Sequence, residues 1–407
     1  MQGFARRHTV RAALAWLDAQ LRRLEAETVP LRAAAGRVLA APITSDVDVP
    51  GFDRATMDGY AVVAESTDGA APYSRVALTV VGDALAAAPF PHTLARGEAL
   101  RIMTGAPMPA GADAVLPAEW VEPDAGTSGR VSAVVTVSPG KNVGRRGEDI
   151  LAGTLVLDAG RLLRPQDLGV MSSIGVGRAS VVRRPRVRLI ITGNELLPSG
   201  SRPRGSRIAD ANGPMLAALA ERDGAVVDFP GLVGDEPEAI LAGLHAGADI
   251  VIVSGGSSVG IEDLAPVLLA THGELAVHGI AMRPSSPTGL GRLGSRLIFL
   301  LPGNPVSALC AYDFFAGRAI RALGGRPTAW PYRSVRARLA RKISSPIGRL
   351  DYARVRLEDG RVAPLSVAGA SVLSSTTRAD GFVIVGDDSE GFPAGADVDV
   401  WLYGPNA

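Results

Sequence analysis

The stretch "DIVIVSGGSSVG", residues 249–260, decides the fold class of this 407-residue chain. The four residues from Ile250 to Val253 are all β-branched, and such an unbroken apolar run is typical of a strand covered on both faces. Serine, glycine and valine alone make up residues 254–260, so this loop offers hydroxyl groups and bare backbone. A buried strand followed by a small polar loop predicts a parallel sheet that binds a ligand beyond its strand ends.

The segments on either side of this stretch alternate apolar strands with helices over residues 186–325. The pattern predicts a strand at "RVRLIITG" (186–193), helices at "DANGPMLAALAERDGA" (210–225) and "EPEAILAGLHAGA" (236–248), and strand, loop and helix at "RLIFLLPGNPVSALCAYDFFAGRAI" (296–320). A series of this kind predicts a mostly parallel, doubly wound sheet.

Different patterns flank the α/β series. Leucines at positions 14, 17, 21 and 24 predict an amphipathic helix over residues 9–27, with Thr9 as its N-cap. Short β-rich runs between proline and glycine turns continue to about residue 141 and predict a small all-β domain. Similar runs after residues 325–333 predict a small C-terminal barrel or sandwich. Arg349 and Arg354 alternate poorly as strand partners there, which predicts that at least one of them is a solvated surface residue.

Composition excludes several classes of function. Apolar residues make up 47% of the chain and charged residues 20%, and the formal net charge is +1. No global field therefore steers the chain toward nucleic acid or an anionic membrane, so recognition of an anion has to be local. The single cysteine, Cys310, is predicted to be a buried helical thiol, and the five histidines lack metal-ligand spacing. Without a signal-peptide core or an apolar run long enough to span a bilayer, the sequence predicts a cytoplasmic protein.

Three of the predicted strands end in distinctive loops, "ITGNEL" (191–196), "VSGGSSVGIED" (253–263) and "LLPGNPVSA" (300–308). Backbone amides that precede a helix form anion-binding sites. The loops are therefore predicted to hold a phosphorylated or polar ring system by their backbone. The alternative interpretation is that they are only tight strand-to-helix turns.

Individual residues of these loops have predicted tasks. Gly255 and Gly256 allow close approach of the backbone to a ligand, and the next two serines supply hydroxyl donors. Pro302 and Pro305 are expected to stiffen the third loop. In that loop Gly303 is expected to adopt an unusual backbone angle, and Ser307 to cap the following helix.

The ordered motifs of the chain resemble one known family. They are "DVDVPGFDRATMDGYAV" (46–62), "RIMTGAPMPAGADAV" (101–115), "GEDI" (147–150), "TGNEL" (192–196), "SGGSSVG" (254–260) and "LPGNPVSA" (301–308). In this order and spacing they resemble the MoeA/gephyrin family, the molybdenum insertases of molybdenum-cofactor biosynthesis. The resemblance covers essentially the whole chain.

This resemblance implies a multidomain α/β plus β fold, with an elongated subunit of four domains. A discontinuous helical domain is expected at residues 1–48 and 142–180, an inserted β domain at 49–141, a doubly wound, MogA-like α/β domain at 181–328 and a small C-terminal β-barrel domain at 329–407. The implied assembly is a homodimer. The site is expected in a cleft between the α/β and C-terminal domains, completed by the β domain of the partner subunit.

The resemblance also implies the reaction. Adenylylated molybdopterin and molybdate are the expected substrates, the phosphoanhydride is hydrolysed with Mg²⁺ present, and AMP and the metal-loaded cofactor are released. A molybdopterin adenylyltransferase and a molybdoenzyme are the protein partners that this chemistry implies.

Site residues carry over position by position. The positions that match catalytic residues are Asp58, Asp149, Glu195 and Asp263. Those that match cofactor-binding residues are Thr104, Asp210, Asn212, Gly255, Gly256, Ser257, Ser258, Pro302, Gly303, Asn304, Pro305 and Ser307. Asp235 and Asp263 match acidic residues suited to Mg²⁺, which takes one or two carboxylates plus phosphate oxygens. Asp235 has a second interpretation as the N-cap of the helix after it. Gly213 stands where the family commonly has arginine.

The chain departs from the family at the expected oxyanion site. A family pattern like K-P-G-K-P is replaced by Arg283, Pro284, Ser285, Ser286 and Pro287. Arg283 retains one cation and can form a bidentate fork, whereas Ser286 donates a hydrogen bond and cancels no charge. Losing one cation weakens oxyanion binding by roughly tenfold to a hundredfold. Arg349, in the C-terminal domain, is a candidate to compensate.

Two functions therefore compete. The first is a working insertase with an arginine-rich oxyanion pocket. The second is a molybdopterin-binding paralogue that acts as carrier or partner of a molybdoenzyme. A receptor-clustering scaffold like gephyrin lacks support because the chain has no extra domain or long linker, and an NAD-dependent dehydrogenase lacks support because no strand-GxGxxG-helix unit is present.

Overall fold

The computed structural model describes residues 7–86, 89–124, 128–256, 264–358, 360–366 and 371–404. The chain divides into two compact units. Unit 1 comprises Met1–Thr28, Gly36–Ala40 and Ser180–Ala407, and unit 2 comprises Val29–Ala35 and Ala41–Ala179. Within the described residues, no helix has both the length and the apolar character needed to cross a membrane.

Unit 2 contains a six-stranded sheet in the order β7-β4-β6-β5-β9-β8. Its strands are β4 (Gly59–Val62), β5 (Val76–Ala84), β6 (Glu98–Ile102), β7 (Ala114–Pro117), β8 (Val121–Pro123) and β9 (Arg130–Ala133). Alternate side chains enter two separate clusters, with Leu116 in one and Val115 in the other, so both faces of this sheet are covered. Unit 2 also holds the pairs β2 (Ile43–Thr44) with β11 (Leu155–Leu157) and β3 (Arg54–Ala55) with β10 (Val143–Gly144), and the helix α2 (Pro165–Ser173).

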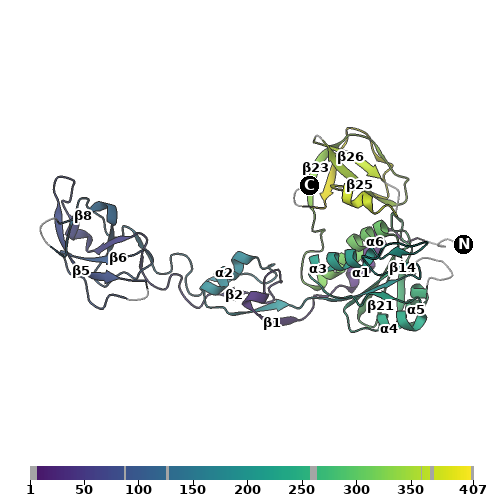
Figure 1. Cartoon of the computed structure of the whole chain (residues 1–407), viewed down its shortest axis with the longest axis horizontal. Helices are drawn as coiled ribbons and strands as arrows, with labels where there is room; N and C mark the ends of the chain where they lie inside the picture. Colours follow the sequence, from purple (N-terminus) through teal and green to yellow (C-terminus); the bar gives the residue numbers. More distant parts are fainter. Residues whose placement is uncertain are drawn as a thin grey trace. The chain divides into compact units, whose positions relative to one another are not determined.

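The core of unit 1 is a sheet in the order β16-β13-β18-β22-β21-β19, with β17 also on β13. Its strands are β13 (Arg186–Thr192), β16 (Val226–Asp228), β17 (Leu232–Val233), β18 (Ile250–Ser254), β19 (Glu274–His278), β21 (Gly289–Leu293) and β22 (Arg296–Leu301). Figure 1 labels β21 of this sheet. The central pairs are parallel, and β21 and β19 form an antiparallel edge. The predicted mostly parallel sheet is confirmed.

Helices cover both faces of this sheet. Ile250 and Ile252 of β18 pack in one cluster with α1 (Val10–Gln20), α3 (Asn212–Arg222), α6 (Pro305–Ala311) and α7 (Gly317–Leu323). Val251 and Val253 pack on the other face with α4 (Pro237–Leu244) and α5 (Leu264–His272). The unbroken apolar run thus alternates between two cores, which is why it has no polar position.

The first helix is shorter than the sequence predicts. Thr9 is its N-cap and accepts a hydrogen bond from the Ala12 amide at 3.1 Å, as predicted. The helix ends at Gln20 rather than at residue 27, because Leu21 is extended and the Leu24 amide donates to the Leu323 carbonyl at 2.9 Å. Residues Ala26–Pro30 form strand β1 instead, paired with β12 (Arg178–Val182).

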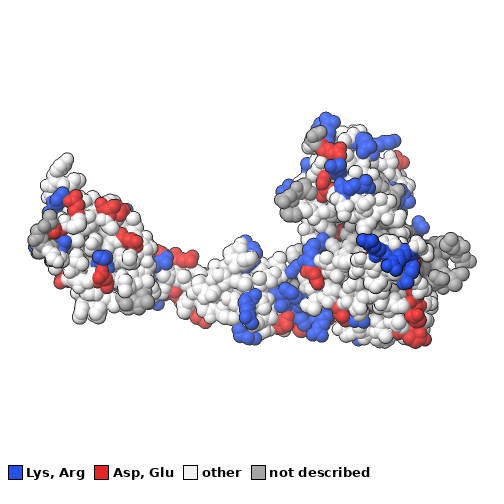
Figure 2. Space-filling view, viewed as in Figure 1, with Lys and Arg blue, Asp and Glu red and all other residues white. Residues whose placement is uncertain are grey.

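A closed barrel of five strands forms the C-terminal part of unit 1. Strands follow the order β25-β26-β23-β29-β27, and β27 pairs back to β25. The strands are β23 (Arg333–Leu339), β25 (Leu350–Glu358), β26 (Arg361–Ser366), β27 (Gly381–Val385) and β29 (Asp397–Leu402), and β20 (Met282–Arg283) adds to β25 in parallel. Arg354 is completely buried and Arg349 half-buried, so the expectation that one of them is a solvated surface residue is wrong. On the face shown in Figure 2, basic and acidic side chains lie among uncharged ones, as the net charge of +1 leads one to expect.

A buried carboxylate lies where the barrel meets the helices of unit 1. Asp313 belongs to the π-helical turn η4 (Tyr312–Ala316) and is 1% exposed. The hydroxyl groups of Tyr332 and Tyr352 donate to its two carboxylate oxygens at 2.9 Å and 3.3 Å. Burial raises the pKa of Asp313 to about 6. Cys310, in the preceding helix, is buried as predicted, and burial raises the pKa of its thiol.

We expect Asp313 to make the stability of unit 1 depend on pH. Because its folded pKa of about 6 lies above the value of about 3.9 in an unfolded chain, protonation favours the folded state. This contribution is complete below about pH 4 and is lost as pH rises through about 6, by up to roughly 3 kcal/mol. In Asp313→Asn this contribution should be absent. Denaturant unfolding followed by tryptophan fluorescence from pH 4 to 8 measures the difference between the two proteins, and a difference that is constant with pH would contradict the assignment.

Candidate functional site

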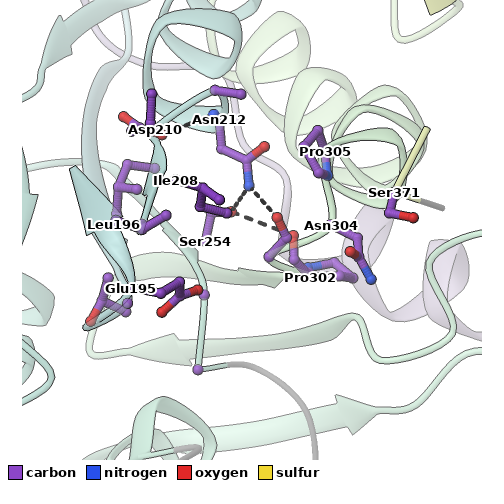
Figure 3. A pocket seen from close by; sticks show the side chains of 18 of the residues that line it. Glu195, Leu196, Ile208, Asp210, Asn212, Ser254, Pro302, Asn304, Pro305 and Ser371 are labelled. Atoms are coloured by element: carbon purple, nitrogen blue, oxygen red, sulfur yellow. Dashed lines mark hydrogen bonds between the residues drawn. The ribbon is translucent and has the colours of Figure 1, made fainter. Parts of the chain in front are cut away.

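The three predicted loops meet at one pocket of about 620 Å³ in unit 1. Parallel strands β13, β18 and β22 end side by side at Thr192, Ser254 and Leu301, so their following loops share one edge of the sheet. The pocket is lined by Thr192, Gly193, Glu195, Leu196, Ile208, Asp210, Asn212, Asp235, Ser254, Gly255, Gly256, Pro287, Pro302, Gly303, Asn304, Pro305 and Ser371, among others (Figure 3).

The glycines of these loops differ in their tasks. Gly255 has φ +104°, and a Cβ there would lie 2.0 Å from the Thr192 carbonyl oxygen, so only glycine fits. Gly256 is also left-handed, at φ +53°. Gly303 does not have the unusual backbone angle that we expected: its φ is not positive, and its carbonyl oxygen accepts a hydrogen bond from Asn212 instead. The requirement for glycine therefore lies at the end of β18.

Asn212 joins the strand ends to one another. Its Nδ2 donates to Ser254 Oγ at 2.9 Å and to the Gly303 carbonyl at 2.8 Å, bonds that Figure 3 shows crossing the pocket wall. Its own Oδ1 is buried and has no hydrogen-bond partner among the described residues. A ligand that donates a hydrogen bond at this wall can satisfy that oxygen.

Asp210 organises the start of α3. Its Oδ1 accepts hydrogen bonds from the amides of Asn212 and Gly213, both at 2.9 Å. A Cβ at Gly213 would lie 2.3 Å from both Asp210 Oδ2 and Phe229 Cζ. This crowding leaves no room for a side chain at position 213 in the present arrangement of Asp210 and Phe229.

Asp235 lies in the pocket and does not cap a helix. Helix α4 begins at Pro237, its N-cap is Glu236, and Asp235 accepts a short hydrogen bond from Thr192 Oγ1. The interpretation of Asp235 as an N-cap is therefore wrong. Glu195 and Asp210 bring further carboxylates to the pocket. The described residues contain no group of three or more His, Cys, Asp or Glu side chains around one point, but Mg²⁺ needs only one or two carboxylates when phosphate oxygens complete its shell. Asp235 fits that donor set.

A second pocket, of about 760 Å³, adjoins the first. The two share Pro287, Pro302 and Asn304 as lining residues. The other walls of the second pocket come from residues 281–286, Ser307, the barrel segment 346–349, and Arg7 and Thr9. All three predicted oxyanion-binding residues, Arg283, Ser286 and Arg349, line it.

The two arginines of the second pocket share one buried carboxylate. Asp351 is fully buried, and it forms a short ion pair with Arg283 Nη2 and a contact of 3.3 Å with Arg349 Nε. The arginine side chains remain 29% and 32% exposed, so their outer edges are accessible from the pocket while Asp351 lies behind them. Two guanidinium groups and one carboxylate leave a local charge of +1 facing the cavity.

Two serines complete this wall. Ser286 Oγ is buried without a hydrogen-bond partner among the described residues, so its hydroxyl is available to a ligand. Ser285 has φ +93°, a left-handed conformation at the position where the family pattern has glycine. Its Oγ donates to the Ser307 carbonyl at 2.5 Å. Ser307 itself lies inside α6, whose N-cap is Asn304, so the prediction that Ser307 caps this helix is wrong.

The remaining predicted site residues lie in unit 2 or outside the described residues. Asp58 accepts hydrogen bonds from the Thr104 amide at 2.6 Å and from its hydroxyl at 2.7 Å, and these bonds lower the pKa of Asp58. Asp149 is exposed in the same unit. Ser257, Ser258 and Asp263 fall outside the described residues.

Several pocket residues were not named individually from the sequence, although Thr192 and Ser254 belong to the predicted ligand-binding loops. Thr192, Ser254 and Ser371 line the first pocket, and Arg7 lines the second. The first two are strand-end residues, and the rule that ligands bind beyond parallel strand ends is a signal that identifies them. Arg7 and Ser371 have no such signal, since long-range packing brings them to the pockets.

Three family models match successive parts of the chain. They are the MoeA N-terminal region (domains I and II) over residues 8–175, a probable molybdopterin binding domain over residues 188–322, and the MoeA C-terminal region (domain IV) over residues 336–403.

Curated relatives and solved structures agree with these matches. A protein named molybdopterin molybdenumtransferase 2 from Mycobacterium tuberculosis is 36% identical, over 92% of this chain and 94% of the relative. The molybdopterin molybdenumtransferase of Haemophilus influenzae is 32% identical, over 92% of this chain and 93% of its own. The crystal structure of a molybdopterin biosynthesis MoeA protein from Pyrococcus horikoshii is 33% identical, with a TM-score of 0.81 over 98% of this chain and 100% of that one.

Proposed function

The chain belongs to the MoeA family of molybdopterin molybdenumtransferases, and from this premise we propose that it inserts molybdate into adenylylated molybdopterin, releasing AMP, in molybdenum cofactor biosynthesis. The single observation that carries the proposal is the adjoining pair of pockets in unit 1. One is walled by strand-end backbone and carboxylates, and the other by two arginines, with Pro287, Pro302 and Asn304 between them.

The first pocket suits the pterin and its phosphates. Its polar groups include backbone atoms of Gly255, Gly256 and Gly303. Asn212 Oδ1, which has no hydrogen-bond partner in the described part of the chain, offers an acceptor to a ring N–H. Groups of this kind orient a flat heterocycle by hydrogen bonds from one edge. Glu195 lies across the pocket from Asn304 and Ser371 (Figure 3).

The second pocket suits the oxyanion. Arg283 and Arg349 present guanidinium edges, and Ser286 presents a hydroxyl donor that no other described residue engages. Charge-assisted hydrogen bonds contribute about 1.5–3 kcal/mol each, so the two arginines and the hydroxyl would each help to hold molybdate in the second pocket. Held there, the metal oxide lies beside the ligand of the first pocket, which shortens the approach of the two substrates.

Mg²⁺ fits this proposal at the first pocket. Asp235, with Asp263 as the second ligand, would hold the ion together with phosphate oxygens of the substrate. When bound, it would neutralise charge that develops on the phosphoanhydride as AMP leaves. Thr192 positions Asp235 by the hydrogen bond to its Oδ1, which leaves the second carboxylate oxygen available.

The remaining parts of the proposal concern assembly and setting. We expect a homodimer in the cytoplasm, whose partners are a molybdopterin adenylyltransferase and a molybdoenzyme. Asp58, Thr104 and Asp149 of unit 2 are expected as further site residues. The joined Asp58 and Thr104 pair supports a shared task, because an ionised carboxylate fixed by two donors is a preorganised group. Mass measurement in solution tests the dimer.

A single reconstituted assay tests the function. Purified protein is incubated with adenylylated molybdopterin, Mg²⁺ and molybdate, and both released AMP and cofactor-bound molybdenum are measured. The proposal expects both products in equal amounts. Release of AMP without metal capture, or tight pterin binding with neither product, would contradict insertion and support a molybdopterin carrier.

A further inference from the structure

The segment that precedes helix α1 pairs through its backbone with residues 279–281, which lie just before Arg283 and Ser286. The His8 amide donates to the Gly279 carbonyl at 2.9 Å, and the Ala281 amide donates to the His8 carbonyl at 2.8 Å. His8 thus forms a parallel β-bridge with Ile280, which lies three residues before Arg283. This pairing places the residues on both sides of His8, Arg7 and Thr9, in the lining of the second pocket.

Arg7 brings a cation that no carboxylate of the described residues neutralises. Among the described residues it forms no hydrogen bond or ion pair, whereas Arg283 and Arg349 both contact Asp351. The side chains of Arg283, Arg349 and Asp351 together give the pocket a net charge of +1. With Arg7 the total becomes +2, which balances the −2 charge of a molybdate dianion.

A second feature of the same segment adds to this field. Thr9 caps the 11-residue helix α1 and lines the pocket, so the amino end of the helix lies at the cavity. The macrodipole and the unpaired amides of a helix start favour an anion nearby. The segment therefore brings two sources of positive potential to the second pocket, the side chain of Arg7 and the amino end of α1.

Resting on the proposed function, we propose that Arg7 supplies the second positive charge for the oxyanion, replacing the cation that Ser286 does not provide. Arg7 is exposed, so it acts at the entrance and its effect is screened by salt more strongly than that of Arg283. The substrate for this residue is a tetrahedral dianion. A phosphate group has the same chemistry as molybdate, and the proposal commits to molybdate.

The test compares molybdate binding among full-length variants by calorimetry at low salt. Arg7→Gln should weaken binding by about tenfold, and raising salt should reduce the difference. Arg11→Gln is the matched control, because Arg11 is exposed in the first turn of α1 but lines neither pocket. Ser286→Lys should tighten binding, and in Arg7→Gln/Ser286→Lys it should restore affinity to near that of the parent. A residue with a merely structural task would show neither the rescue nor the salt dependence.

Other outcomes overturn the proposal in distinguishable ways. Equal molybdate affinity in Arg7→Gln and the parent would exclude Arg7 as a residue that binds the oxyanion and would leave the proposed function intact. A loss of inorganic phosphate binding with unchanged molybdate binding would assign Arg7 to a substrate phosphate instead. Absence of molybdate binding in the parent protein itself would overturn the oxyanion pocket, and with it both proposals.

Discussion

Replacing Arg283 with glutamine should weaken molybdate binding by about a hundredfold and reduce metal insertion correspondingly. Arg283 and Arg349 together outweigh Asp351 by one charge. Without Arg283 the cluster is neutral, and the fully buried carboxylate of Asp351 faces the oxyanion with one cation between them. The loss should exceed that for Arg7, which is exposed to solvent, because a half-buried charge is screened less.

Control variants separate charge from folding. Arg283→Lys keeps the cation and should retain most of the affinity, although it lacks the bidentate fork. Arg292→Gln removes an exposed arginine that pairs with Glu274 across β21 and β19 of the α/β sheet, and it should leave binding unchanged. In Arg283→Gln/Asp351→Asn the local charge returns to +1, so much of the affinity should return. Thermal unfolding of each variant shows whether it is folded. Unchanged molybdate affinity in folded Arg283→Gln would place the oxyanion elsewhere.

The parallel sheet was predictable from the sequence because its signal is local. The β-branched run of β18 has no polar position, and the structure shows that its alternate residues enter two different cores. The same reasoning placed three loops at one edge of the sheet, and residues of all three loops line one pocket there. The spacing of apolar residues was sufficient to predict these features, because a strand that is buried on both faces has an unbroken apolar sequence.

Features that depend on contacts between distant segments were not predictable. The first helix ends at Gln20 although leucine spacing continues to residue 24, because the Leu24 amide binds the chain near residue 323. Gly303 resembled a residue needed for its backbone angle, but the requirement falls on Gly255, where Thr192 crowds the Cβ position. Arg7 joins the second pocket only through the pairing of His8. No spacing rule connects such residues before the fold is known.

Changing Asp235 to asparagine should lower Mg²⁺-dependent AMP release by about a hundredfold while leaving binding of adenylylated molybdopterin nearly intact. Asparagine has the same shape and can still accept the hydrogen bond from Thr192, so the pocket wall should be preserved. What it removes is the negative charge that the proposed ion requires. Rapid-quench measurement of AMP across a range of Mg²⁺ concentrations tests this. The matched control is Asp228→Asn, an exposed aspartate at the end of β16 that pairs with Arg188 outside the pocket. Full AMP release by Asp235→Asn with an unchanged Mg²⁺ dependence would exclude Asp235 as a ligand and transfer that task to other carboxylates of the pocket, Glu195 first.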